Sequence, residues 1–329
     1  YIYEDEITLD GTFGLNPYEE EITAFENAMD IFEFVANITF TESNSINDSH
    51  ILWASLDDED SNDPGETGVL GYAYAPDSGD DVSGLTTING DEYTTDDEIK
   101  DPEILLPGSF FYSIVTHELG HALGLEHPFD MDKFPGVNDT YDPGDNGFNA
   151  QPYTFMTYSN VDANKYMPEE EADNGFLEGM GAFDIAATQY LYGPNKNTST
   201  GDDTYYLDEE DSNGWYCIWD NGGTDTISAE DAETSVSIDL RNATLENEVG
   251  GGGYISQIGN DSLGLTIAYN STGDCIIENA TGSDQDDTLR GNELNNILDG
   301  GAGDDILNGG NGADDLRGGR GHDTYIVDN

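Results

Sequence analysis

The chain has 329 residues, with 70 acidic and 8 basic side chains, a formal net charge of −62, and a hydrophobic share of 36%. The length suggests about two domains, and the hydrophobic share is enough to build folded cores. So negative a chain repels phosphates, which excludes nucleic acids and anionic membranes as partners. No hydrophobic run approaches the roughly 18 residues of a membrane span, and residues 1–6 lack the basic and apolar segments of a signal peptide.

The first half of the chain predicts a mixed α/β domain. Hydrophobic residues recur every three or four positions over residues 17–36, which is typical of an amphipathic helix. The same criteria, together with the helix-stopping pair Gly193-Pro194, predict five more elements. These are strands at 37–40, 51–54 and 69–75, and helices at 109–123 and 181–192.

From about residue 195 the composition changes to glycine, aspartate, asparagine and threonine, and residues 282–326 contain a nine-residue repeat. The five copies read GSDQDDTLR, GNELNNILD, GGAGDDILN, GGNGADDLR and GGRGHDTYI. This is the GGxGxDxUx pattern of calcium-binding parallel β-rolls, in which glycines allow tight turns and the aspartate supplies oxygen to the ion. A large apolar residue should fill the interior at the eighth position, which holds Leu289, Leu298, Leu307, Leu316 and Tyr325.

These repeats predict a set of calcium ligands. A flexible Gly/Asp-rich tail is the alternative, but it does not explain why the apolar position stays in register. The first two copies lack paired glycines, so calcium binding is predicted chiefly for residues 300–323. The candidate ligands are Asp287, Asn296, Gly300, Ala302, Asp305, Gly309, Asn311, Asp314, Gly318 and Asp323.

Three of the five histidines, His117, His121 and His127, lie within eleven residues. His117 and His121 are four positions apart, so they share one face of the predicted helix and can bind one tetrahedral zinc ion. Gly124 can adopt the left-handed conformation that ends a helix, which brings in His127 as a third ligand. Three nitrogen ligands leave a fourth position open to water, as a catalytic zinc site requires.

Glu118 follows the first of these histidines and can reach the zinc-bound water. Zinc lowers the pKa of such a water toward about 7, and the carboxylate can take its proton during attack on a carbonyl and return it to the leaving amine. A purely structural zinc site is the alternative, but nothing structural requires a glutamate at this position. The extended pattern HExxHxxGxxH also predicts a methionine turn, which Met156 supplies as an apolar floor about 30 residues beyond His127.

Together these features resemble the serralysin-type metzincins, secreted bacterial zinc metalloendopeptidases with an RTX calcium-binding β-roll behind the catalytic domain. The likeness rests on the zinc motif ending in Pro128, the turn at 156–158, the segments DIAATQYLYG and WDNGGTDT, and the repeats. It covers residues 117–326 and extends toward the N-terminus. It implies an α+β metzincin zinc-protease domain at residues 1–194, followed by an all-β parallel β-roll (RTX) domain at residues 195–329.

The resemblance also implies roles for single residues. Tyr158 would be an additional zinc ligand in the resting enzyme and would leave the metal to stabilise the oxyanion with its hydroxyl. An edge strand that pairs with an extended peptide substrate would be formed by Gly71, Tyr72, Ala73, Tyr74 and Ala75. Further calcium ligands would be Asp202, Asp220, Gly222, Gly223, Asp225 and Glu278.

The chain departs from the family pattern in two places. The family usually has an arginine just before the first calcium-binding aspartate, whereas Thr198 and Ser199 precede Asp202 here, which weakens the prediction of that site. The chain also ends after the fifth repeat, where the family normally continues with further strands and a C-terminal secretion signal. The absence of an N-terminal signal fits the one-step export of the family, although a trimmed chain would show the same absence.

The acidity is not explained by calcium binding. Residues 1–195 carry 42 acidic and 3 basic side chains, against 28 and 5 in residues 196–329. We therefore hypothesise adaptation to high salt, because a Debye length of about 3 Å at 1 M screens self-repulsion. A marine or calcium-rich habitat without a strict salt requirement is the alternative.

The two cysteines, Cys217 and Cys275, are too few for a disulfide framework or a zinc knuckle. Both lie in strand-like surroundings in the second half. A single disulfide between them and two buried thiols that pack as small apolar residues are equally compatible with the sequence.

The sequence predicts a secreted, extracellular, monomeric zinc metalloendopeptidase that hydrolyses internal bonds of extended or unfolded proteins. It would use one catalytic zinc ion and several structural calcium ions, with Glu118 as general base. The alternative from another class is a calcium-stabilised binding or adhesive module with an inactive metzincin half. The intact zinc ligands, general base and methionine turn argue against this alternative. A third interpretation keeps the chemistry but directs it at one dedicated substrate or at peptidoglycan-like amides.

Overall fold

The structure is a computed structural model that describes residues 7–9, 12–14, 18–43, 49–56, 70–74, 84–89, 94–95, 98–99, 102–159, 175–207, 214–259 and 264–327. Ala75, the last residue of the predicted edge strand, lies outside this range. Among the helices described, none is both long enough and apolar enough to cross a membrane.

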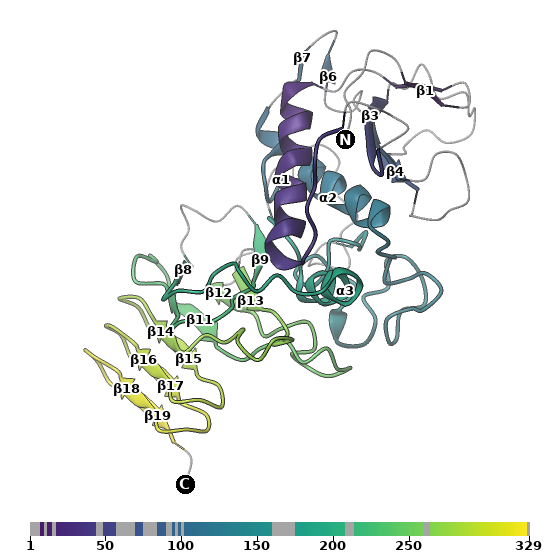
Figure 1. Ribbon diagram of the computed structural model, residues 1–329. Coiled ribbons are helices and arrows are strands. Elements are labelled where there is room, and N and C mark those ends of the chain that lie inside the picture. The colour runs from purple at the N-terminus through teal and green to yellow at the C-terminus, as the bar shows by residue number, and fades with distance from the viewer. Residues whose placement is uncertain are drawn as a thin grey trace.

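The helices of the first half follow the ranges that hydrophobic spacing predicts (Figure 1). Helix α1 buries a stripe that includes Phe25, Met29 and Phe32, and it packs on α2, which is buried on nearly every side. Because α2 also lies against the small sheet of this half, its histidine face is held from two directions. The helices are α1 (Glu19–Val35), α2 (Phe110–Ala122) and α3 (Ala182–Tyr192), with 3-10 turns at Pro102–Leu105 and Asp145–Gly147.

The small sheet has the strand order β3-β5-β4, in which β5 (Leu85–Asn89) runs parallel to β3 (Leu52–Leu56) and antiparallel to β4 (Gly71–Ala73). Strands β3 and β4 fall within or beside the predicted ranges 51–54 and 69–75. In the described part of the chain β4 pairs only with β5, so it forms an edge. Two short antiparallel pairs complete this half: β1 (Ile7–Leu9) with β2 (Thr12–Gly14), and β6 (Thr94–Thr95) with β7 (Glu98–Ile99).

The strand predicted at residues 37–40 is not formed. The backbone N–H of Asn37 donates to the carbonyl oxygen of Gly193 at 2.7 Å, and that of Phe40 donates to a carboxylate oxygen of Glu33 at 2.5 Å. These donors are therefore paired with the α3 terminus and with a side chain of α1 rather than with a neighbouring strand. The β-branched and aromatic composition of the segment instead supplies Ile38 and Phe40 to the rim of the core.

The second half consists of two sheets in which nearly all neighbouring strands are parallel (Figure 1). Successive repeats place their strands alternately in the two sheets, so paired strands are 18 residues apart. The first sheet has the order β18 (Asp315–Arg317), β16 (Ile297–Asp299), β14 (Asn279–Thr281), β10 (Thr226–Ser228), β8 (Thr204–Tyr206). The second has the order β19 (Thr324–Ile326), β17 (Ile306–Asn308), β15 (Thr288–Arg290), β11 (Val236–Asp239), β12 (Ser256–Ile258), β13 (Gly264–Ile267), β9 (Trp215–Ile218), and β12 is antiparallel to both neighbours.

The eighth position of the repeat points into the space between the sheets, as predicted, in three of five copies. Leu289, Leu298 and Leu307 are fully buried, and Leu316 is half-buried. The prediction is wrong for Tyr325, which is 48% exposed. Strand β19 is the last of its sheet among the described strands, so no further strand covers the Tyr325 ring. The Tyr325 hydroxyl instead accepts a hydrogen bond from the backbone N–H of Gly318 at 3.0 Å.

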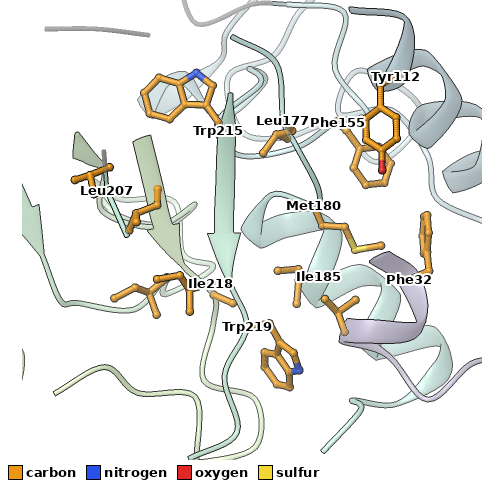
Figure 2. Packing of buried hydrophobic residues seen from close by; sticks show 14 of the residues in the cluster. Phe32, Tyr112, Phe155, Leu177, Met180, Ile185, Leu207, Trp215, Ile218 and Trp219 are labelled. Atoms are coloured by element: carbon orange, nitrogen blue, oxygen red, sulfur yellow. The ribbon is translucent and has the colours of Figure 1, made fainter. Parts of the chain in front are cut away.

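A continuous hydrophobic core joins the two halves. Figure 2 shows Leu177 and Met180 between side chains of β9, such as Trp215, and the α1 side chain Phe32. The backbone continues this junction, because the N–H of Trp215 donates to the carbonyl oxygen of Phe176 at 2.8 Å and Leu177 forms a β-bridge with Trp215. The metal-ligating candidates of α2 therefore rest on the same core as the first strands of the second half.

The two cysteines are free thiols. Cys275 is fully buried and Cys217 is half-buried. Burial raises the pKa of both thiols above the ordinary value. Of the two alternatives that the sequence allows, the structure therefore has the pair of packed thiols.

Candidate metal centre

Helix α2 places its last turn so that the chain can fold back over it. The Ser109 side chain caps the start by accepting the N–H of Tyr112 at 3.3 Å. At the other end Gly124 has a φ of 95°, the left-handed conformation that the sequence predicts. The N–H of Leu125 then donates to the carbonyl oxygen of Gly120 at 2.9 Å, and the chain reverses toward His127.

The three predicted histidines converge. The Nε2 atom of His127 lies 3.1 Å from Nε2 of His117 and 3.0 Å from Nε2 of His121. The other ring nitrogens are occupied: Nδ1–H of His117 donates to the carbonyl oxygen of Phe155 at 2.9 Å, and that of His121 to Leu125 at 2.9 Å. Since carbonyl oxygens only accept, both tautomers leave Nε2 as a lone-pair donor toward the common centre.

Asp130 orients the ring of the third histidine, His127, in the same way. One carboxylate oxygen of Asp130 accepts from Nδ1 of His127 at 2.8 Å and from its backbone N–H at 3.0 Å. The sequence prediction did not include Asp130, although its position three residues after the last ligand is a visible signal. Carboxylates of this kind orient a metal-ligating imidazole and raise its basicity.

The surroundings keep the histidines neutral. Burial lowers the pKa of His117 well below its ordinary value and lowers that of His121 to about 4, and the neighbouring histidines act in the same direction. Burial also lowers the pKa of His127, although Asp130 opposes the change. Neutral imidazole is the form that binds metal, so the donor set fits zinc.

Glu118 is buried beside the cluster, and its Oε2 atom has no hydrogen-bond partner among the described residues. Burial raises the pKa of this carboxyl to about 8. The edge strand β4 passes directly over it: a Cβ atom on Gly71 would lie 3.0 Å from Cγ and 3.1 Å from Oε1 of Glu118. The missing side chain of Gly71 therefore lets the edge strand approach the candidate base.

The methionine turn lies beneath the helix, as predicted. Met156 is buried, and a Cβ atom on Gly120 would lie 2.7 Å from its sulfur, so close approach requires the glycine. Asp184 at the start of α3 holds the turn through two hydrogen bonds and caps its own helix through a third. Its carboxylate accepts from the Thr154 hydroxyl at 2.6 Å and from the N–H groups of Phe155 and Gly181 at 2.8 and 2.9 Å.

Tyr158 lies at the mouth of the cluster and is 37% exposed. Its ring centroid is 4.9 Å from that of His127 and 5.4 Å from that of His117. Burial of the ring, with Glu118 nearby, raises the pKa of the hydroxyl to about 12, so it is protonated at neutral pH. Phe129 stacks on His127 at 4.5 Å and meets the Tyr158 ring at 5.1 Å.

A second group of candidate ligands forms where the first strands of the second half begin. Carboxylate oxygens of Asp203, Asp220 and Asp225 lie within 4.8 Å of one another. Glu278 joins them by accepting the N–H of Asp225 at 2.8 Å. Oδ2 of Asp225 is buried and has no hydrogen-bond partner in the described segments. Asp203 was not predicted, although it stands next to Asp202, which accepts the N–H of Thr224. The predicted Gly222 and Gly223 form the turn between these groups, both with positive φ.

The repeat carboxylates form rows along the second half. The N–H of Asp287 donates to Oδ1 of Asp305 at 2.9 Å, and that of Asp305 donates to Oδ1 of Asp323 at 3.3 Å. On the opposite side the N–H of Asn296 donates to Oδ1 of Asp314 at 3.0 Å. At the corresponding turns lie the predicted residues Gly300, Ala302, Gly309, Asn311 and Gly318, and a Cβ atom on any of Gly300, Gly309 or Gly318 would collide with the aspartate five residues later.

These rows fit calcium. Oδ2 of Asp305 is buried and has no partner within the described residues. Burial raises the pKa of Asp287 and Asp305, and the neighbouring aspartates raise that of Asp305 further. Clustered carboxylate oxygens are hard donors of the kind that calcium prefers.

Comparisons with known proteins agree with both groups of sites. Residues 11–138 match the family model described as matrixin, and residues 290–325 match that of the RTX calcium-binding nonapeptide repeat. A matrixin match followed by an RTX-repeat match supports a serralysin-type metzincin. The chain is 32% identical to the metallopeptidase AprA of Pseudomonas marginalis over 71% of its own length and 53% of the relative. It is 32% identical to a serralysin of Proteus mirabilis over 75% and 56%, and 33% identical to serralysin C of Dickeya chrysanthemi over 74% and 50%.

The chain thus spans about half the length of the curated relatives that it matches. The family binds one catalytic zinc ion and several calcium ions, and the donor sets described above suit both.

Proposed function

We propose that the chain is a zinc-dependent endopeptidase that hydrolyses internal peptide bonds of extended or unfolded proteins. The observation that carries the proposal is the convergence of three neutral Nε2 atoms beside a buried carboxylate oxygen that has no partner among the residues the structure describes. His117, His121 and His127 would hold the metal. When bound, zinc supplies a Lewis acid and lowers the pKa of a coordinated water.

The chain's own groups supply the remaining chemistry. Glu118, whose raised carboxyl pKa the charge of a bound zinc ion would lower again, would as a carboxylate take a proton from the attacking water. It would later return this proton to the nitrogen of the leaving amine, so that the C–N bond breaks with a neutral leaving group. Tyr158, protonated at neutral pH, would donate its hydroxyl hydrogen to the oxygen of the tetrahedral intermediate. Asp130 would hold the His127 ring in the ligating orientation.

Strand β4 would bind the substrate. Gly71, Tyr72, Ala73 and Tyr74 lie on the edge of the small sheet, directly beside Glu118, with Ala75 outside the described residues. An extended peptide can add to such an edge by main-chain hydrogen bonds, which a folded substrate cannot offer. Unfolded protein is therefore the substrate class that we propose.

We further propose that residues 1–194 form the catalytic metzincin domain and residues 195–329 a calcium-binding parallel β-roll. The alternating parallel strands and the crowded carboxylate rows support this interpretation. Calcium would be bound at the turns of residues 300–323 and near Asp220 and Asp225. The protein would be secreted and would act as an extracellular monomer.

The experiment compares cleavage of unfolded casein by the parent and by Glu118→Gln, at saturating calcium, with zinc content measured in both. We expect the variant to retain zinc and to lose about 10²–10⁴-fold in kcat. Glu126→Gln, an exposed glutamate of the same motif, is the control and should keep full activity. A parent that holds one zinc ion per chain but cleaves nothing would contradict the proposal and favour an inactive domain or one dedicated substrate.

We also propose that the acidity adapts the protein to salt. The catalytic half carries more acidic residues than the calcium-binding half, so ion binding does not explain them. At saturating calcium, the thermal midpoint should rise from low to molar NaCl as self-repulsion is screened. A midpoint that does not rise would reject this part of the proposal and leave an ordinary marine or calcium-rich habitat.

A further inference from the structure

A groove of about 790 Å³ lies on the side of the second half, away from the histidines. Its walls are the turns that follow β15 and β17, together with the loops around Asn242 and Asn270. No member of the zinc cluster and none of the crowded carboxylates lines it. The volume is within the range of ligand-binding clefts.

The groove is less acidic than the rest of the molecule, because Asp239 neutralises Arg241 and the charges of Arg290 and Glu293 are opposite. Arg241 and Arg290, two of only eight basic residues in the chain, line it, whereas Glu293 is the single acidic residue in its lining. The chain as a whole has 70 acidic residues, so a lining with more basic than acidic groups is a local exception. Such an exception creates a site where one negative group is attracted against a repulsive background.

The two arginines are held differently. The guanidinium of Arg241 forms a double hydrogen bond with Asp239 at 2.8 and 2.6 Å and lies 3.4 Å above the Tyr254 ring, which fixes one wall. Arg317, outside the groove, is likewise paired with Asp315 at 2.6 Å. Arg290 is exposed and has no acidic partner among the described residues. Its guanidinium is therefore available for a ligand.

The amide groups of the groove offer further donors. Oδ1 of Asn270 accepts the N–H of Cys275 at 3.1 Å, and Oδ1 of Asn308 accepts the N–H of Gly310 at 3.2 Å. These bonds fix the amide orientation and leave the Nδ2 hydrogens without an acceptor in the part of the chain that the structure describes.

Apolar surface completes the lining. Ile276 is half-buried, and Leu294 and Ile326 are 39% and 47% exposed. The groove thus combines one free guanidinium, several amide N–H donors and small apolar patches. A ligand that fits needs one carboxylate, oxygen acceptors spaced along it, and carbon faces that can leave water.

We propose that this groove binds an acidic oligosaccharide through a sugar carboxylate at Arg290. The ring hydroxyl oxygens would accept hydrogen bonds from Asn270 and Asn308, and the C–H faces would cover Ile276 and Leu294. A dense polyanion is disfavoured because the net charge of −62 repels it beyond the groove. The site would attach the protein to acidic glycans, and the inference does not depend on the peptidase activity.

The test is calorimetric titration of the calcium-saturated chain with a disaccharide that contains one glucuronic acid residue. We expect binding of this probe, about tenfold weaker binding of its neutral glucose counterpart, and no competition by equimolar inorganic phosphate. Arg290→Gln should weaken the acidic probe about tenfold. Asn308→Ala should weaken the acidic and the neutral sugar equally.

The control is Arg320→Gln, an exposed arginine at a turn that does not line the groove, which should bind like the parent. Circular dichroism and calcium content of each variant show whether it is folded. Equal binding of the acidic and neutral probes, an equal loss in Arg320→Gln, or full displacement by phosphate would each overturn the proposal, the last by showing a simple anion site.

Discussion

The histidine cluster and the carboxylate rows both gather metal-binding atoms, but they do so in opposite ways. Three histidines from one helix and the turn after it supply nitrogen atoms, and each ring is oriented by a partner such as the carbonyl oxygen of Phe155. In the rows, Asp287, Asp305 and Asp323 come from turns 18 residues apart and are adjacent only because the strands pair. The first site is local in sequence, and the second is a product of repetition.

The two kinds of site therefore differ in how much electrostatic repulsion remains when no ion is bound. The pKa of each histidine is lowered by burial, so the empty cluster is neutral and adds no repulsion. The rows hold negative charges near one another, and Oδ2 of Asp305 is buried with no partner in the described part of the chain. A fold that depends on cations is therefore expected for the rows and not for the histidines.

The largest expected effect is the removal of calcium. Chelation of calcium with zinc present should abolish most of the far-ultraviolet β signal of the second half, because the carboxylates then repel across neighbouring turns. Chelation of zinc with calcium present should lower the thermal midpoint by only about 2–4 °C. Equal losses of β signal and of thermal midpoint in the two treatments would contradict the proposed difference between the carboxylate rows and the histidine cluster.

The next effect concerns Asp184, the buried carboxylate that holds the methionine turn. Burial raises its pKa to about 7, although its hydrogen bonds oppose the change, so the folded state keeps a proton that the unfolded state releases above about pH 4. Stability from this group is therefore lost as pH rises from about 4 to 7, by up to roughly 4 kcal/mol. Asp184→Asn lacks this titration.

Denaturant unfolding of parent and variant from pH 4.5 to 7.5 measures that difference, with calcium and zinc saturating. The stability of the variant relative to the parent should rise with pH across this window. Parallel curves would show that the three hydrogen bonds keep the carboxylate ionised at an ordinary pKa.

A smaller effect is expected at Asp130. Asp130→Asn keeps the shape of the side chain but weakens the acceptor for Nδ1–H of His127, so zinc affinity should fall about 10–100-fold. Competition with a zinc indicator measures this without reference to activity. Asp132→Asn, an exposed aspartate two residues further, is the matched control and should leave the affinity unchanged.

The smallest effect is a change in stability at Asp305 whose sign depends on whether calcium is present. Asp305→Asn removes one buried charge from the row, so it should stabilise the second half without calcium by about 1 kcal/mol and weaken calcium binding about tenfold. Asp304→Asn, the exposed neighbour, should do neither to the same extent. Melting curves with and without calcium decide this, and a loss of stability in both conditions would contradict the charge-repulsion account of the rows.

Local patterns were sufficient for some of these features. The spacing of His117, His121 and Gly124 specified a helix face and its end, because both depend on residues one turn apart. The repeat likewise specified the strand period and the buried leucines such as Leu298. These properties require only the geometry of a helix turn or of one repeat.

Contacts between distant segments decided the rest. Residues 37–40 have the composition of a strand. The N–H groups of Asn37 and Phe40, however, donate to the carbonyl oxygen of Gly193 and to the side chain of Glu33 in α1. Tyr325 has an interior position in the repeat, yet it is exposed because its strand has no described neighbour beyond it. Hydrogen-bond partners and burial depend on which distant segments pack against a residue, and the local periodicity of the sequence does not contain that information.

Local sequence patterns thus specify the candidate metal-binding atoms, the helix that presents them and the repeat that spaces the carboxylates. Only the tertiary structure decided that Asp130 holds His127, that Gly71 brings the edge strand onto Glu118, and that Asp203 joins the acidic group. The physical reason is that ligand identity follows from side-chain chemistry at short spacing. Orientation and access follow from backbone segments that meet only in the folded chain.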